Sequence, residues 1–283
     1  MAGLRNWCWK PSLHEVTAAR RVEEEHSMST PPPLSTTGRV IRAALIILPF
    51  GTVLLGIMSF VLFFDKKEQT VQRSIKYAAG LRKDLNEADL KHYEQVVSDA
   101  LAKPPAERTR TLATFLDSTL GPENMGYQVR SFMDRTDPKA PPLALDVELT
   151  GSKRPRDLVV VLGSYLPADV VTGLDLDTPR GLAAFLGVAH ASTGLAKVRS
   201  LRFAAIQNVA ALKNYYEEGI QVGERITHVL LLGEIANAPD AEVTSRLHLE
   251  GRGVVLLRPN LKGEVLPAAQ TLLKTVTELA DRL

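Results

Sequence analysis

Residues 157–163, DLVVVLG, are the clearest indication of the fold of this chain. Their five consecutive apolar residues are typical of a strand that is buried on both faces, as strands are in parallel sheets. Three further strands are expected after it, at 200–207, 227–235 and 253–259. Helices are expected between or after these strands, at 178–190, 209–218 and 266–283. Strands that alternate with helices predict an α/β domain with a mostly parallel sheet, flanked by helices on both faces.

Two segments before the central strand extend this sheet. Residues 126–135 (GYQVRSFMDR) and 143–151 (LALDVELTG) alternate apolar and polar side chains. This alternation predicts a pair of antiparallel strands, with a proline-containing loop between them.

Residues 43–64, AALIILPFGTVLLGIMSFVLFF, form an uncharged apolar run. A helix of this length spans roughly 33 Å, and the hydrocarbon core of a bilayer is about 30 Å thick. We therefore predict a transmembrane helix at 40–64, with the lipid bilayer as the partner of residues 43–64. The run is longer than the apolar part of a signal peptide, and Phe63-Phe64-Asp65 is no cleavage site, so we expect an uncleaved signal anchor.

Residues 1–39 are expected to form a disordered tail, because 30–38 is rich in Pro, Ser and Thr. Residues 1–27 differ in character from the rest of the chain, and Met28 is a second candidate start of translation. We place the soluble domain of this single-pass membrane protein on the extracytoplasmic side. The distribution of Lys and Arg around the span leans slightly against that orientation.

A helical juxtamembrane segment is expected at 66–121, followed by the α/β domain at 122–283. Apolar residues recur at helical spacing across 66–102, and Asn86 is the predicted N-cap of the second helix there. A further helix is expected to begin at Pro104-Pro105 and to end before Gly121.

The composition excludes several kinds of site. The net charge is +2 and the basic and acidic residues are interspersed, so we expect no nucleic acid as a partner. Cys8 is the only cysteine, which excludes a disulfide within the chain and a cysteine-based zinc site.

The segment from Pro122 to Asn208 resembles the catalytic domain of the di-zinc aminopeptidases, the family of bacterial leucyl aminopeptidases, glutamate carboxypeptidase and the transferrin receptor. The resemblance lies in four sequence segments: GPENMGYQVRSF, LDVELTGSKRPRDLVVVLGSY, DTPRGLAAFLGVAHA and VRSLRFAAIQN. The resemblance implies a truncated zinc-aminopeptidase-like fold. It also directs attention to the carboxyl ends of the strands, where open α/β sheets bind ligands.

The family's metal ligands do not carry over to this chain. In the family the first buried strand ends in a His-x-Asp pattern, and a later strand ends in Asn-Glu-Glu. The degenerate positions of that site are here Ser164, Leu166, Leu176, Asp177, Val209, Ala210 and Glu234. Aliphatic side chains cannot donate an electron pair to zinc, and the remaining acids are too few for two ions. We therefore predict no metal, no other cofactor and no catalytic residue.

Other signals have simpler interpretations. The histidines are expected at the surface or near helix ends: His14, His26, His92, His190, His228 and His248. Ser164 lacks the second glycine of a nucleophile elbow, and Pro167 stands where the following helix should begin. Asp175 and Asp177 are interpreted as a loop residue and a helix-start residue, in preference to a small cation site.

Two clusters have a favoured interpretation and an alternative. Lys153-Arg154-Pro155-Arg156 is predicted to be a basic hairpin loop. A solvated turn is favoured there over a contact with anionic lipid or a protein. Tyr215-Tyr216 is interpreted as a half-buried helix face.

The function expected from these observations is that of a membrane-anchored pseudoenzyme. Its zinc-aminopeptidase-like domain would act in binding or assembly with an unknown protein partner. Helices 66–120 are the expected contact surface, because they add amphipathic area that a minimal peptidase sheet does not need. Two alternatives stay open: a membrane-bound hydrolase or peptidase that uses a non-standard site, and a purely structural anchor.

Overall fold

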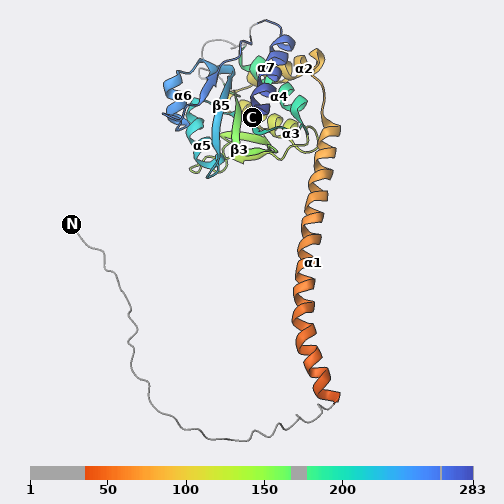
Figure 1. Ribbon diagram of the computed structural model, residues 1–283. Helices are drawn as coiled ribbons and strands as arrows, with labels where there is room; N and C mark the ends of the chain where they lie inside the picture. Colours follow the sequence, from red (N-terminus) through yellow and green to blue (C-terminus); the bar gives the residue numbers. More distant parts are fainter. Residues whose placement is uncertain (1–35, 167–176, 262, 283) are drawn as a thin grey trace, which may run out of the picture. The chain divides into compact units, whose positions relative to one another are not determined.

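The computed structural model describes residues 36–166, 177–261 and 263–282 (Figure 1). Contacts divide the chain into two units, Met1–Phe63 and Phe64–Leu283. The predicted tail before residue 36, with Met28, lies outside the described residues, and so do Pro167, Asp175 and Leu176.

Helix α1 runs from Thr36 to Leu81. Its stretch Ile47–Phe64 has a mean hydropathy of 2.3 and is not buried by any other part of the structure. The described residues thus contain one helix that is long and apolar enough to cross a membrane. Residues 36–39, which we assigned to the disordered tail, are helical. The helix also continues past residue 64 to Leu81. Residues 65–81 contain no proline that would interrupt it.

The unit Phe64–Leu283 contains a six-stranded sheet with the order β1-β2-β4-β3-β5-β6. The strands are β1 (Arg130–Phe132), β2 (Ala144–Leu149), β3 (Arg154–Ser164), β4 (Arg199–Ile206), β5 (Arg225–Leu232) and β6 (Val255–Leu257). Strands β4, β3, β5 and β6 are parallel, and β1 and β2 form the antiparallel edge. The predicted α/β class, the mostly parallel sheet and the antiparallel pair are confirmed.

Several strand boundaries differ from the prediction. Strand β5 ends at Leu232, because Gly233 adopts a φ of +68° and turns the chain into a 3-10 helix, η2 (Gly233–Asn237). Strands β1 and β6 have only three residues each. Strand β3 begins at Arg154, so the predicted basic hairpin loop is mostly strand: Arg154 pairs with Arg199 of β4.

Helices cover both faces of the sheet (Figure 1). One face carries α2 (Glu87–Leu101), α3 (Pro105–Leu120), α4 (Asp177–Ser192) and α7 (Val265–Asp281). The other face carries α5 (Leu212–Gly219) and α6 (Asp240–Arg246). Alternate residues of β3 serve the two cores, with Val159 and Val161 toward α4 and Leu158 and Val160 toward α5. The predicted N-cap is confirmed, since the Asn86 side chain accepts a hydrogen bond from the Asp89 amide.

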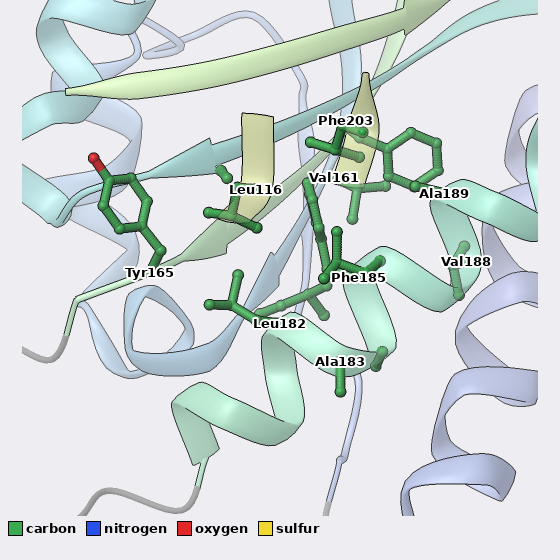
Figure 2. Packing of buried hydrophobic residues seen from close by; sticks show 14 of the residues in the cluster. Leu116, Val161, Tyr165, Leu182, Ala183, Phe185, Val188, Ala189 and Phe203 are labelled. Carbon is green, nitrogen blue, oxygen red and sulfur yellow. The ribbon is translucent and has the colours of Figure 1, made fainter. Parts of the chain in front are cut away.

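Helix α4 lies at the centre of the larger core. Figure 2 shows Leu182 and Phe185 of this helix pointing toward Val161 and Phe203 of the sheet, and the Phe185 and Phe203 rings meet edge to face at 5.7 Å. At Gly187 an added Cβ would lie 2.5 Å from a methyl carbon of Leu90, so glycine lets α2 approach closely. This tight contact fixes α4, whose first turn lies beside the carboxyl ends of the strands.

Candidate functional site

The carboxyl ends of β4, β3 and β5 lie side by side. Ser164 is paired with Ile206 and Gly163 with Leu232. Beyond the strands the backbones stay connected, because the Leu166 amide donates to the Gln207 carbonyl at 3.1 Å. We call this region, formed by residues 164–166, 207–210 and 233–234, the carboxyl edge. It is the place where open α/β sheets bind ligands.

Ser164 is buried at the carboxyl edge, with 1% of its surface exposed. Its hydroxyl oxygen accepts a hydrogen bond from the Ile235 amide at 3.2 Å. Gly233 lies directly against it, since an added Cβ there would be 2.9 Å from the Ser164 oxygen. A nucleophilic serine needs an accessible hydroxyl, and this hydroxyl instead holds η2 in place.

The described apolar members of the predicted degenerate site, Leu166, Val209 and Ala210, have different surroundings. Leu166 packs against the core on the α4 face, whereas Val209 packs against the core on the α5 face. Ala210 is exposed. Asn208 caps the short 3-10 helix η1 (Val209–Ala211), because its side-chain oxygen accepts from the Ala211 amide at 3.2 Å.

The acidic members of that site lie at element starts. Asp177 is the first residue of α4, and Glu234 is the second residue of η2. Thr178, where we expected the helix to begin, is the second residue of α4 and is buried. The structure brings Ser164 and Gly233 together. The Thr178 Cα is also close, 3.7 Å from the position of a Gly233 Cβ.

The carboxyl edge does not fit a pair of zinc ions. In the part of the chain that the structure describes, no three His, Cys, Asp or Glu side chains come together in a group that could hold a metal. A zinc pair needs a bridging carboxylate and further oxygen or nitrogen ligands for each ion. The side chains at this edge include aliphatic groups, and the Ser164 hydroxyl is engaged with the backbone.

A hollow of about 190 Å³ lies next to this edge, at the ends of β5 and β6. Its lining includes Leu232, Gly233, Asn237 and Arg258. The Arg258 guanidinium donates to the carbonyls of Ala236 and Ala238 at 2.7 and 2.8 Å, so it fastens η2 to the end of the sheet. It also forms an ion pair with Asp240. Arg258 was not predicted as a site residue, because it lies inside the strand expected at 253–259.

A buried group of charges, also missed, crosses β1, β2 and β4 on the α5 face. We call Arg130, Asp146, Glu148, Arg202 and Glu224 the charged network. Arg130 forms a two-point hydrogen bond to Asp146 at 2.7 and 2.8 Å. Arg202, with no exposed surface, donates to Glu148 at 2.6 Å and to Glu224 at 2.8 Å. The available signal was the presence of charged residues inside otherwise apolar stretches, as in LRFAAI around Arg202.

The protonation of the charged network follows from its burial. Burial raises the pKa of Asp146, and the Arg130 guanidinium partly offsets this rise. Burial alone would lower the pKa of Arg202, but Tyr215 and the two glutamates outweigh it and raise that pKa. A set of mostly paired, largely buried charges holds elements together.

The described histidines and tyrosines have structural roles. His190 is buried and lies in the last turn of α4, one of the two positions expected for a histidine, and its ring nitrogen contacts the carbonyl of Leu81, the last residue of α1, at 2.9 Å. Burial lowers the pKa of His190. Tyr215 is also fully buried beside the charged network, while Tyr216 is half-buried as predicted. Tyr165 turns its hydroxyl away from the core in Figure 2 and donates to the Pro142 carbonyl.

Comparisons with known proteins give structural likeness only. No protein-family model matches the chain, and no curated protein matches it. The fold resembles a Zn-dependent exopeptidase from Parabacteroides distasonis, with 11% identity over 71% of this chain and 99% of that chain and a TM-score of 0.48. It also resembles the glutaminyl cyclase of Porphyromonas gingivalis, with 12% identity over 67% and 98% and a TM-score of 0.46.

A third similar structure is the glutaminyl cyclase of an Acidobacteriales bacterium, with 10% identity over 70% of this chain and 97% of that chain and a TM-score of 0.47. The resemblance to zinc aminopeptidases predicted a fold of this kind. At these identities and TM-scores the likeness says nothing about activity, metal or substrate in this chain.

Proposed function

We propose that this chain is a single-pass membrane protein whose zinc-aminopeptidase-like domain is catalytically inactive and acts in binding or assembly. The observation that carries the proposal is the composition of the carboxyl edge. Ser164 supports the backbone of η2, Leu166 and Val209 pack into opposite cores, and the described side chains there do not fit a zinc pair.

A hydrolysis assay tests the inactivity. The full chain, purified in detergent with zinc supplied, is expected to release no p-nitroaniline from leucyl-p-nitroanilide above the rate of a buffer blank. Chelator-sensitive hydrolysis would contradict the proposal and favour a hydrolase with a non-standard site. A bacterial leucyl aminopeptidase assayed in the same detergent is the positive control.

The membrane anchor is supported by the apolar surface of α1. Leu48, Phe50 and Phe60 are 64 to 69% exposed, an arrangement that water does not favour and a bilayer does. The full chain is expected to stay in the membrane fraction after extraction at alkaline pH. Release into the supernatant would contradict the anchor. Protection of the soluble domain from protease in closed spheroplasts would contradict the proposed extracytoplasmic side.

The outer surface of α2 and α3 is the proposed contact surface for a protein partner. A shallow hollow of about 570 Å³ lies there, lined by Val96, Arg110, Thr114 and Phe115 among others. It combines an aromatic ring with a charge, as many interface centres do. Affinity capture from detergent-solubilised membranes is expected to recover a protein partner. The Thr114→Arg variant should no longer capture this partner, whereas the control variant Lys274→Glu, changed at an exposed residue, should still capture it. Recovery of no stable partner would favour a purely structural anchor.

A further inference from the structure

The three central parallel strands all begin with an arginine. These are Arg154 of β3, Arg199 of β4 and Arg225 of β5. Because amino ends of neighbouring parallel strands meet at one edge of a sheet, the three lie together, and Arg154 is paired directly with Arg199. Lys153 and Arg156 add two exposed charges. We call these five residues the amino edge.

Few carboxylates balance the amino edge. Asp157 pairs with Arg225 through hydrogen bonds of 3.1 and 2.9 Å and lies 4.0 Å from Arg154. Glu224, next to Arg225 in sequence, turns inward to Arg202. Within the described residues neither Lys153 nor Arg156 forms an ion pair. Like charges that face each other across strands are unfavourable unless an anion offsets them.

Arg199 is the clearest unbalanced group. Its Nε and Nη1 atoms are buried and have no hydrogen-bond partner among the described residues. A guanidinium presents its donors in a fork that matches carboxylate and phosphate oxygens. Burial lowers the pKa of the nearby His228, and the positive charges of Arg199 and Arg282 lower it further. The local potential is therefore positive.

An apolar residue projects beside these charges. Val222, in the turn before β5, is fully exposed. Gly223 follows it with a φ of +90°, and the Arg156 guanidinium lies near, with Nη1 3.7 Å from the position of a Gly223 Cβ. An apolar tip next to a basic side chain is an arrangement that peripheral surfaces use on anionic membranes, where the tip enters the acyl boundary and the cation meets phosphates.

We propose that the amino edge, with Val222, is a contact site for the phosphate groups of anionic phospholipids. This inference rests on the proposed membrane anchor, since the apolar helix of the same chain would keep a lipid surface at high local concentration. Lipid is favoured over an acidic protein because Val222 adds an apolar point to the charges. The site would hold the domain against the surface without any role for the carboxyl edge.

The test uses the full chain with a fluorophore that responds to polarity, attached at position 222 in a Cys8→Ser, Val222→Cys variant. The labelled chain is placed in nanodiscs of phosphatidylcholine alone or with phosphatidylglycerol. A blue shift is expected only with phosphatidylglycerol, and it should weaken in high salt. Each basic residue near an anionic surface contributes about a fivefold factor in binding, so Lys153→Glu with Arg156→Glu should abolish the shift. The matched control, Lys139→Glu with Lys274→Glu, should retain it.

The outcomes separate the lipid site from the anchor. A chain that enters neutral discs but gives no shift with phosphatidylglycerol would overturn the lipid site and leave the anchor standing. A chain that does not enter discs, yet shifts when phosphatidylglycerol vesicles are added, would overturn the anchor and support the lipid site. A shift produced in neutral discs by inorganic phosphate, and not by phosphatidylglycerol, would assign the site to a free phosphate and overturn the lipid proposal.

Discussion

The two ends of the same three strands differ in how their polar groups are satisfied. At the carboxyl edge the Ser164 hydroxyl accepts from Ile235, and Asn208 accepts from Ala211. At the amino edge Arg199 keeps two buried nitrogen atoms without a hydrogen-bond partner in the described chain, and Arg154 faces it. In α/β sheets the carboxyl end is the expected ligand site, yet here the cluster of weakly balanced basic side chains lies at the other end.

This difference shows that the fold alone does not determine where a ligand can bind. The sheet order and the helices around it place a site at the carboxyl edge, but Ser164 and Asn208 there are already engaged with backbone amides and have less to offer a ligand. Groups that stay unsatisfied inside a structure call for an explanation, and an external partner is one. Substitutions at each end of the strands test this difference between the two edges.

The largest expected effect contrasts two arginines of β4. Arg202→Met would leave Glu148 and Glu224 buried without their cation and lower the free energy of unfolding by about 3–5 kcal/mol. Arg199→Met removes a charge that has no acidic partner, so it should change stability by less than about 0.5 kcal/mol. Chemical denaturation of the detergent-solubilised chain, followed by circular dichroism, measures both. Equal losses would show that Arg199 is a structural residue and would remove the contrast.

A smaller effect is expected from closing the carboxyl edge further. Gly233→Ala combines a positive φ with a Cβ placed 2.9 Å from the Ser164 oxygen, and should lower stability by about 3 kcal/mol. Gly251→Ala is the matched control, since its φ is +70° but the space around it is open. That control should lose only about 1 kcal/mol. If both variants lose the same amount, η2 is not held tightly against Ser164.

The smallest effect concerns the titration of His228. Burial, and then Arg199 and Arg282, lower its pKa below the ordinary value of 6.5. Between pH 6.5 and that lower pKa, His228 binds more protons in the unfolded chain than in the folded chain. The stability that neutral His228 contributes is therefore present above pH 6.5 and is lost as the pH falls below it. Arg199→Met should raise the pKa of His228 toward 6.5 in an NMR titration, with His228→Gln assigning the signal. An unchanged pKa would mean that Arg199 does not contribute to it.

The sequence predicted the fold where local pattern and tertiary environment agree. The apolar run at 157–163 is the central strand β3, and the Asn86 cap begins α2 as expected. Boundaries failed where one residue redirects the chain, as Gly233 does at the end of β5. Pattern alone could not show that Gly233 has a positive φ.

The site was harder to predict than the fold. Sequence spacing identified Ser164 and the residues after β4 and β5, and the structure does bring Ser164 and Gly233 together. Sequence spacing could not reveal the charged network, because the pairing of Arg202 with Glu224 depends on a turn that returns the chain to the sheet. The basic segment at 153–156 was visible, but its meeting with Arg199 and Arg225 depends on strand register.

Zinc binding tests the central claim about the carboxyl edge most directly. The full chain, purified in detergent and equilibrated with micromolar zinc before gel filtration, is analysed for bound metal by mass spectrometry. We predict less than one zinc ion per four chains, because no three described His, Cys, Asp or Glu side chains come together at this edge, and a pair of zinc ions needs a bridging carboxylate and further ligands for each ion. Two zinc ions per chain, lost on Glu234→Ala and retained in Glu250→Ala, would contradict the account.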